Sequence, residues 1–107
     1  MTRVDLVTVA VQGDFGKPRP ALVIQSSLFC AHASATILPL SSALVSAPLM
    51  RVTVHPSPSN GLSKPSQIMV DKSTTVLREK LGKPFGKLDP HTLREVDRCL
   101  AVFFGLV

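Results

Sequence analysis

The sequence predicts a mainly β fold, a small and strongly bent sheet or barrel that is closed by a single C-terminal helix. Short runs rich in Val, Leu, Ile and Thr recur between residues 4 and 77, and Gly- and Pro-containing turns separate them. This pattern is typical of short antiparallel strands. The hydrophobic period becomes helical only after residue 88, where Leu93, Val96, Leu100 and Phe103 recur at helical spacing.

Strands are expected where β-branched and apolar residues cluster. Gly13, Gly16, Pro18 and Pro20 predict a loop between the first two strands, because proline cannot donate to a central ladder. Pro39 is expected to end the third strand, and residues 56–65 form a long loop within one domain. The strands themselves are predicted at residues 4–11, 21–24, 35–38, 50–55, 66–70 and 74–77.

The last element is an amphipathic helix. Asp89 is a favourable N-cap and Pro90 suits the first helical position. We expect the apolar stripe of this helix to pack on the sheet, and the face that carries Arg94, Glu95, Asp97 and Arg98 to be solvated.

Length and charge bound the function. The chain has 107 residues, so we expect one domain over 1–107. Its formal charge of +5 favours a polyanionic partner, either a nucleic acid or an acidic protein segment. The chain has no signal peptide pattern and no apolar run of the roughly 20 residues that a membrane span needs, which predicts a cytoplasmic protein without membrane contact. Cys30 and Cys99 are expected to be free thiols, and no metal or other cofactor is predicted.

The most informative stretch is residues 13–25, GDFGKPRPALVIQ. Arg19 stands between two prolines at the start of an apolar strand, with Lys17 close by, and a guanidinium held in this way suits a phosphate. A solvated basic turn is the simpler alternative. Ser41 and Ser42 follow the third strand, where loop hydroxyls are well placed for a ligand. An arginine and a hydroxyl could together stabilise and orient a reacting phosphate.

A second chemistry uses histidine. His32 and His55 could act as the acid and base of a metal-free ribonuclease, because two imidazoles near neutral pKa can move the protons of RNA cleavage. The sequence contains no nucleophilic triad signature, no phosphate-binding Walker loop and no paired-cysteine zinc motif.

Four segments together resemble the MazF/PemK-type toxins of bacterial type II toxin–antitoxin pairs, which are endoribonucleases also called mRNA interferases. Residues 13–25 resemble the family's signature loop and second strand, and LPLS at 38–41 resembles the end of its third strand. The segment 60–71 resembles the next block, and 86–106 resembles the terminal helix with the turn before it. The resemblance covers nearly the whole chain.

The resemblance implies a CcdB/PemK-like fold, a bent SH3-like barrel that works as a homodimer. It also implies metal-independent, sequence-specific cleavage of single-stranded mRNA by attack of the adjacent 2′-hydroxyl, and an acidic antitoxin partner. Arg19 would be the main catalytic residue, and Ser41 would orient the scissile phosphate, with Ser42 as the alternative hydroxyl. The further residues expected to contact RNA are Lys17, Ser42, Asp14 and Arg51.

Two other functions remain open at this level. A toxin of the same fold could poison DNA gyrase by binding it, although that branch depends on a terminal Trp-Gly-Ile and this chain ends FFGLV without any tryptophan. An inactive barrel could instead bind nucleic acid without cleaving it. Five Phe and no Trp or Tyr argue against extensive base stacking as its binding mode.

Overall fold

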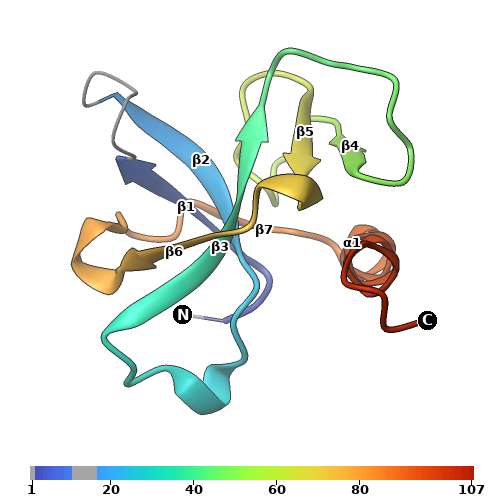
Figure 1. Cartoon of the computed structure of the whole chain (residues 1–107). Helices are drawn as coiled ribbons and strands as arrows, with labels where there is room; N and C mark the ends of the chain where they lie inside the picture. The colour runs from blue at the N-terminus through green and yellow to red at the C-terminus, as the bar shows by residue number, and fades with distance from the viewer. Residues whose placement is uncertain (1, 11–16) are drawn as a thin grey trace.

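The computed structural model describes residues 2–10 and 17–107. Within them, seven antiparallel strands form one bent sheet in the order β4-β5-β3-β2-β1-β7, with β6 paired to β3 off this path (Figure 1). One helix, α1 (Pro90–Phe103), lies beside β4. The strands are β1 (Asp5–Ala10), β2 (Pro18–Val23), β3 (Ser34–Ser41), β4 (Arg51–Val54), β5 (Ser66–Met69), β6 (Thr74–Leu77) and β7 (Gly86–Lys87). The mainly β half-barrel with a terminal helix is confirmed.

The longest strand, β3, changes partners along its length. Its first half pairs with β6, from Ser34 opposite Leu77 to Ile37 opposite Thr74. Its second half pairs with β5, where Leu40 lies opposite Ile68. This change of partner bends the sheet, because β5 and β6 follow one another in the chain but lie along different halves of the same strand.

Both faces of the central strands are buried. Alternate side chains of a strand point to opposite faces, so Leu6 and Leu22 enter one apolar cluster while Val7 and Ala21 enter another. All four are 0% exposed. The apolar run of β2 is therefore buried on both faces, as its composition predicts.

The terminal helix closes the first of these clusters. Asp89 caps it by accepting a hydrogen bond from the Thr92 amide, and Pro90 begins it. Val96 and Cys99 are buried against the sheet, whereas Phe103 at the end of the stripe is 44% exposed and does not belong to the core. Asp97 is also not simply solvated, because it forms an ion pair with Arg3. Within the described residues, no helix is both long enough and apolar enough to cross a membrane.

Two expectations about proline are wrong. Strand β2 already begins at Pro18, and Pro20 pairs with Thr8 of β1. Strand β3 continues through Pro39 to Ser41. Both exceptions have the same cause, because in each case no neighbouring strand needs the missing N–H. Strand β3 pairs with β2 only from Ala21 onward, so Pro18 and Pro20 lie outside that paired part of β2. Pro39 stands between the segment of β3 that pairs with β6 and the segment that pairs with β5.

Candidate active site

A cavity of about 650 Å³ opens where β2 and β3 separate. The two strands pair from Val23 opposite Ile37 to Ala21 opposite Pro39. If this register continued by two residues, Arg19 would stand opposite Ser41. Instead, β3 turns to pair with β5 at Leu40, and the strands diverge at this point. The fork leaves Arg19 and Ser41 on facing walls of one cavity.

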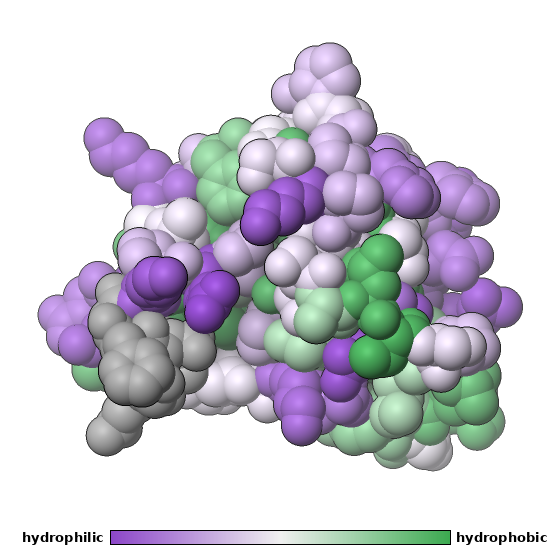
Figure 2. All heavy atoms as spheres, turned by 90° about the horizontal axis from the view of Figure 1, so that it is seen from above, coloured by the Kyte–Doolittle hydropathy of each residue, from purple (hydrophilic) through white to green (hydrophobic). Residues whose placement is uncertain are grey.

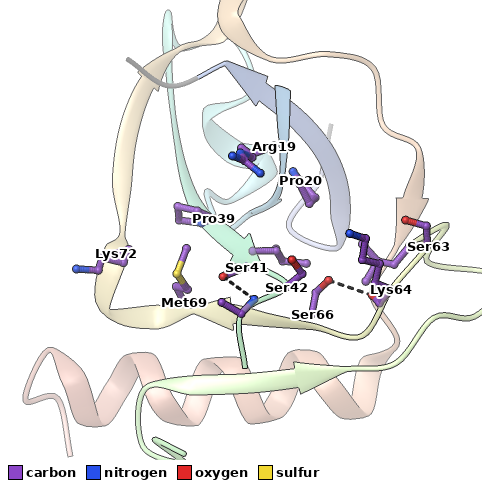
Figure 3. A pocket seen from close by; sticks show the side chains of 13 residues that line it. Arg19, Pro20, Pro39, Ser41, Ser42, Ser63, Lys64, Ser66, Met69 and Lys72 are labelled. Atoms are coloured by element: carbon purple, nitrogen blue, oxygen red, sulfur yellow. Dashed lines mark hydrogen bonds between the residues drawn. The ribbon is translucent and has the colours of Figure 1, made fainter. Parts of the chain in front are cut away.

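The cavity is built from three strands and the loops that follow or precede them. Figure 3 shows Arg19 and the Ser41–Ser42 pair on different sides of the opening, with Lys64 and Lys72 on opposite sides of the serines. The lining residues are Arg19, Pro20, Pro39, Leu40, Ser41, Ser42, Ala43, Leu62, Ser63, Lys64, Ser66, Met69 and Lys72.

Arg19 owes its position to β2. It pairs with Val9 of β1, and prolines on both sides restrict the backbone. The side chain of Arg19 is therefore attached to a rigid segment of backbone. Arg19 is exposed, while Ala21 and Leu22, which follow Pro20, are fully buried. The core therefore anchors the strand that carries this cation to the cavity.

The two hydroxyls lie where β3 ends. Ser41 pairs with Gln67 of β5, and its Oγ accepts a hydrogen bond of 3.1 Å from the Ala43 amide. This local bond turns the chain out of the strand. Ser42, which follows, is exposed at the cavity wall. Both hydroxyls reach the cavity, so the choice between them stays open.

Two further cations reach the cavity that the sequence does not predict as site residues. Lys64 enters from the loop before β5, and Lys72 comes from the 3₁₀ turn between β5 and β6, at residues 70–72. One signal for Lys64 is present in the sequence: like Lys17, it directly precedes a proline at the start of a strand. Arg19, Lys64 and Lys72 are the cations among the described lining residues, and none of those lining residues is acidic.

Two of the remaining predicted RNA contacts, Lys17 and Arg51, do not line this cavity. Lys17 is exposed just before β2 but is outside the lining set. Arg51 forms a bidentate ion pair with Asp71, with Nε to Oδ1 at 2.9 Å and Nη2 to Oδ2 at 3.2 Å. Arg51 lowers the pKa of the Asp71 carboxyl through this hydrogen bond. Asp14 lies outside the described residues.

The histidine alternative receives no support from the positions of its two residues. His32 lines a separate cavity of about 430 Å³ beside Phe29 and Thr36. Its Nδ1 accepts a hydrogen bond from the Ser34 amide. His55 follows β4, and neither imidazole lines the cavity that contains Arg19.

The described part of the chain offers no cluster of metal ligands. No group of three or more His, Cys, Asp or Glu residues lies close enough there to hold an ion. Cys30 is exposed, Cys99 is buried, and the two thiols are not joined. Burial raises the pKa of the Cys99 thiol, so it is held as the neutral thiol among apolar neighbours.

These features define a class of protein: a half-barrel of antiparallel strands with cations and hydroxyls lining a cavity at a strand fork. Comparison with known proteins identifies the class. Residues 2–104 match the family model described as "PemK-like, MazF-like toxin of type II toxin-antitoxin system", and the chain belongs to this family.

The relatives agree with this assignment. The chain is 43% identical over 107 residues to a protein of Mycolicibacterium smegmatis named "Probable endoribonuclease MazF", covering 99% of this chain and 98% of that protein. The fold matches the Mycobacterium tuberculosis toxin MazF-mt6 with a TM-score of 0.81 at 20% identity, over 94% of this chain and 96% of that one. It also matches an endoribonuclease solved in complex with its cognate antitoxin from a mycobacterial species, with a TM-score of 0.81 at 21% identity, over 100% and 97% of the two chains.

Proposed function

We propose that this toxin is an endoribonuclease that cleaves single-stranded mRNA at specific sequences and thereby inhibits translation and growth. The observation that carries the proposal is the fork between β2 and β3, where Arg19, the Ser41–Ser42 pair and two lysines line one cavity without a carboxylate among the described lining residues. The 43% identical relative named as a probable endoribonuclease supports the reaction class.

The proposed reaction uses a nucleophile that RNA itself supplies. The 2′-hydroxyl gives up its proton to water as its oxygen forms a bond to the adjacent phosphorus. The bond from phosphorus to the 5′-oxygen breaks and that oxygen takes up a proton from water, so that a 2′,3′-cyclic phosphate and a 5′-hydroxyl result. Arg19 stabilises the negative charge that develops on the phosphoryl oxygens, which is the role that a fixed guanidinium performs best. Ser41 or Ser42 orients the scissile phosphate, and the reaction is proposed to need no metal ion.

The partners follow from the charge of the cavity and the surface around it. An acidic, flexible segment of an antitoxin would compete with RNA for the same cations. Solved relatives include complexes with a cognate antitoxin. We also propose that the chain forms a homodimer and acts in the cytoplasm, where mRNA is found.

Exposed hydrophobic side chains support a dimer. Figure 2 shows hydrophobic atoms gathered on its right-hand side, the side on which Figure 1 has the loop between β3 and β4 and α1. Leu49 in this loop is 67% exposed, and Phe104 after α1 is 56% exposed. A monomer that leaves several large apolar side chains in water gains free energy by covering them.

The test of the reaction is Arg19→Ala. We expect cleavage of a defined single-stranded RNA to fall by about 100-fold or more, the scale for losing a main transition-state donor. The products would be resolved by gel electrophoresis, and the cut sites would be mapped at the same time. Arg94→Ala is the matched control, because it removes an exposed arginine of α1 that lies outside the cavity.

Two outcomes would reject the proposal. If the folded Arg19→Ala protein cut RNA at the normal rate, the site would be elsewhere. If the unaltered protein bound RNA with a steep salt dependence but never cleaved it, the protein would be a binding barrel rather than an enzyme.

A further inference from the structure

The loop between β3 and β4 carries Ser42 to the cavity, yet it has little packing of its own. Of residues 42–50 only Ala47 is even partly buried, and all the others are exposed. Such a segment is mobile unless specific bonds hold it. Its position therefore depends on a few contacts with the sheet below.

Gln67 of β5 supplies such contacts. Its side chain is buried, and the residue is only 5% exposed. The amide Oε1 accepts a hydrogen bond of 2.9 Å from the Val45 N–H, and Nε2 donates one of 2.8 Å to the Val45 carbonyl. Nε2 also donates to Thr53 Oγ1 at 3.3 Å. Gln67 thus binds both backbone groups of one loop residue, which needs a donor and an acceptor on the same side chain.

The contacts of Gln67 hold the chain on both sides of Ser42, one of the two candidate hydroxyls. Ser41 is fixed on one side by its pairing with Gln67 itself in the β3–β5 ladder. Val45 is fixed on the other side by the Gln67 amide, so Ser42, Ala43 and Leu44 form a short arch between two points held by one residue. The bond from the Ala43 amide to Ser41 Oγ lies within this arch.

We propose that Gln67 is a positioning residue for the cavity: it holds the β3–β4 loop so that the Ser41 and Ser42 hydroxyls face the scissile phosphate. This inference rests on the proposed endoribonuclease activity. It assigns Gln67 no contact with RNA, and it requires that the buried amide act through the Val45 backbone. Its loss should therefore change the rate of the chemical step more than the affinity for RNA.

The structure offers a matched control in a second glutamine. Gln25, just after β2, holds the loop between β2 and β3 in the same manner. Its Oε1 accepts from the Thr36 amide at 3.2 Å, and its Nε2 donates to the carbonyls of Phe29 and Ser34 at 3.3 and 3.1 Å. Each glutamine makes three side-chain hydrogen bonds, but Gln25 lies at the end of β2 opposite Arg19 and outside the cavity that contains it.

The experiment compares Gln67→Met with Gln25→Met in the full chain. We expect both to lose similar thermal stability, and only Gln67→Met to lower kcat for RNA cleavage, by about 10- to 100-fold, because small misplacements of catalytic groups have effects of that size. KM should change by less than about twofold in both variants. Hydrogen exchange should show faster exchange of the Val45 amide in Gln67→Met alone.

A loop-side variant keeps the test valid if Gln67→Met does not fold. Val45→Pro removes the N–H that Gln67 binds, and Val45 is 49% exposed and lies outside the core. A similar fall in kcat is expected. Equal effects of the two Met variants on kcat, a rise in KM alone, or full activity of Val45→Pro would overturn the role of Gln67. Absence of any cleavage by the unaltered protein would instead overturn the proposed activity. Hydrogen exchange of the Val45 amide would still show whether the Gln67 side chain holds the loop.

Discussion

Arg19 and Arg51 both stand on strands and both are predicted from the sequence to contact RNA, but the structure separates them. Arg19 reaches the cavity at the fork, whereas the Arg51 guanidinium is bound to Asp71 and both side chains are 16% exposed. A residue type shows which chemistry is possible. For Arg51, the neighbouring Asp71 carboxylate holds that charge within the protein.

Arg51→Ala tests this difference. The change leaves the mostly buried Asp71 carboxylate unpaired, so we expect a loss of about 1–3 kcal/mol in the free energy of unfolding. The rate of RNA cleavage should stay within about twofold of the unaltered protein. Urea denaturation and the gel assay would measure the two effects. Arg98→Ala is the control, because its ion pair with Glu95 is exposed and should contribute at most about 0.5 kcal/mol. Weakened RNA binding by folded Arg51→Ala would restore the sequence-based role.

At the scale of elements, buried amide side chains hold the loops that form the cavity. Asn60 is 5% exposed and organises the loop between β4 and β5, because its Oδ1 accepts from the amides of Ser57 and Leu62 and its Nδ2 donates to the His55 carbonyl. The same loop delivers Lys64. Strand β7 packs against it so closely that a Cβ on Gly86 would lie 2.0 Å from the Asn60 carbonyl oxygen, which explains the glycine.

The N-terminal cap of α1 leads to a prediction about how the stability of the protein depends on pH. Asp89 accepts hydrogen bonds from the Thr92 hydroxyl and amide, and these bonds lower the pKa of its carboxyl. A depressed pKa stabilises the fold above the unfolded value of about 4, and this contribution is lost as the pH falls through the folded value. We expect Asp89→Ala to cost about 1 kcal/mol at pH 7, and the difference from the unaltered protein to shrink below pH of about 4.

Asp89→Asn separates the cap from its charge. Asparagine keeps an acceptor for the Thr92 amide, so most of the stability at neutral pH should remain while the acid-dependent part disappears. Denaturation curves at several pH values would measure both variants. A constant difference between Asp89→Ala and the unaltered protein from pH 7 down to pH 3 would contradict the role of the carboxylate.

At the scale of the whole molecule, the chain has a net charge of +5, and three of its cations line one cavity. Arg19, Lys64 and Lys72 come from three separate parts of the chain and meet at one cavity. Affinity for RNA should therefore fall steeply with salt, because each phosphate that is neutralised releases counterions.

Lysine variants test that distribution. Lys64→Ala and Lys72→Ala should each reduce the slope of log affinity against log salt by roughly 0.7, the value for one contact to single-stranded nucleic acid. Fluorescence anisotropy with a labelled RNA at several salt concentrations would measure the slope, with Arg94→Ala as the control. An unchanged slope in both lysine variants would place the RNA outside this cavity.

Much of the fold could be predicted from local sequence because its causes are local. The apolar runs of β1, β2 and β5, the cap at Asp89 and the spacing of Val96 and Leu100 each depend on neighbours within a few residues. The prolines could not be interpreted in this way. Pro18 and Pro39 are compatible with strands only because of which other strands lie beside them.

The candidate site divides in the same manner. The sequence alone placed Arg19 between two prolines and next to a buried strand, and it placed two hydroxyls near the end of the third strand. Only the tertiary structure decided that these groups share a cavity with Lys64 and Lys72, that Asp71 binds Arg51, and that Gln67 holds the loop of Ser42. The physical reason is the fork: it arises from the register of β3 with strands distant in the chain, and long-range pairing is not specified by the pattern of any one segment.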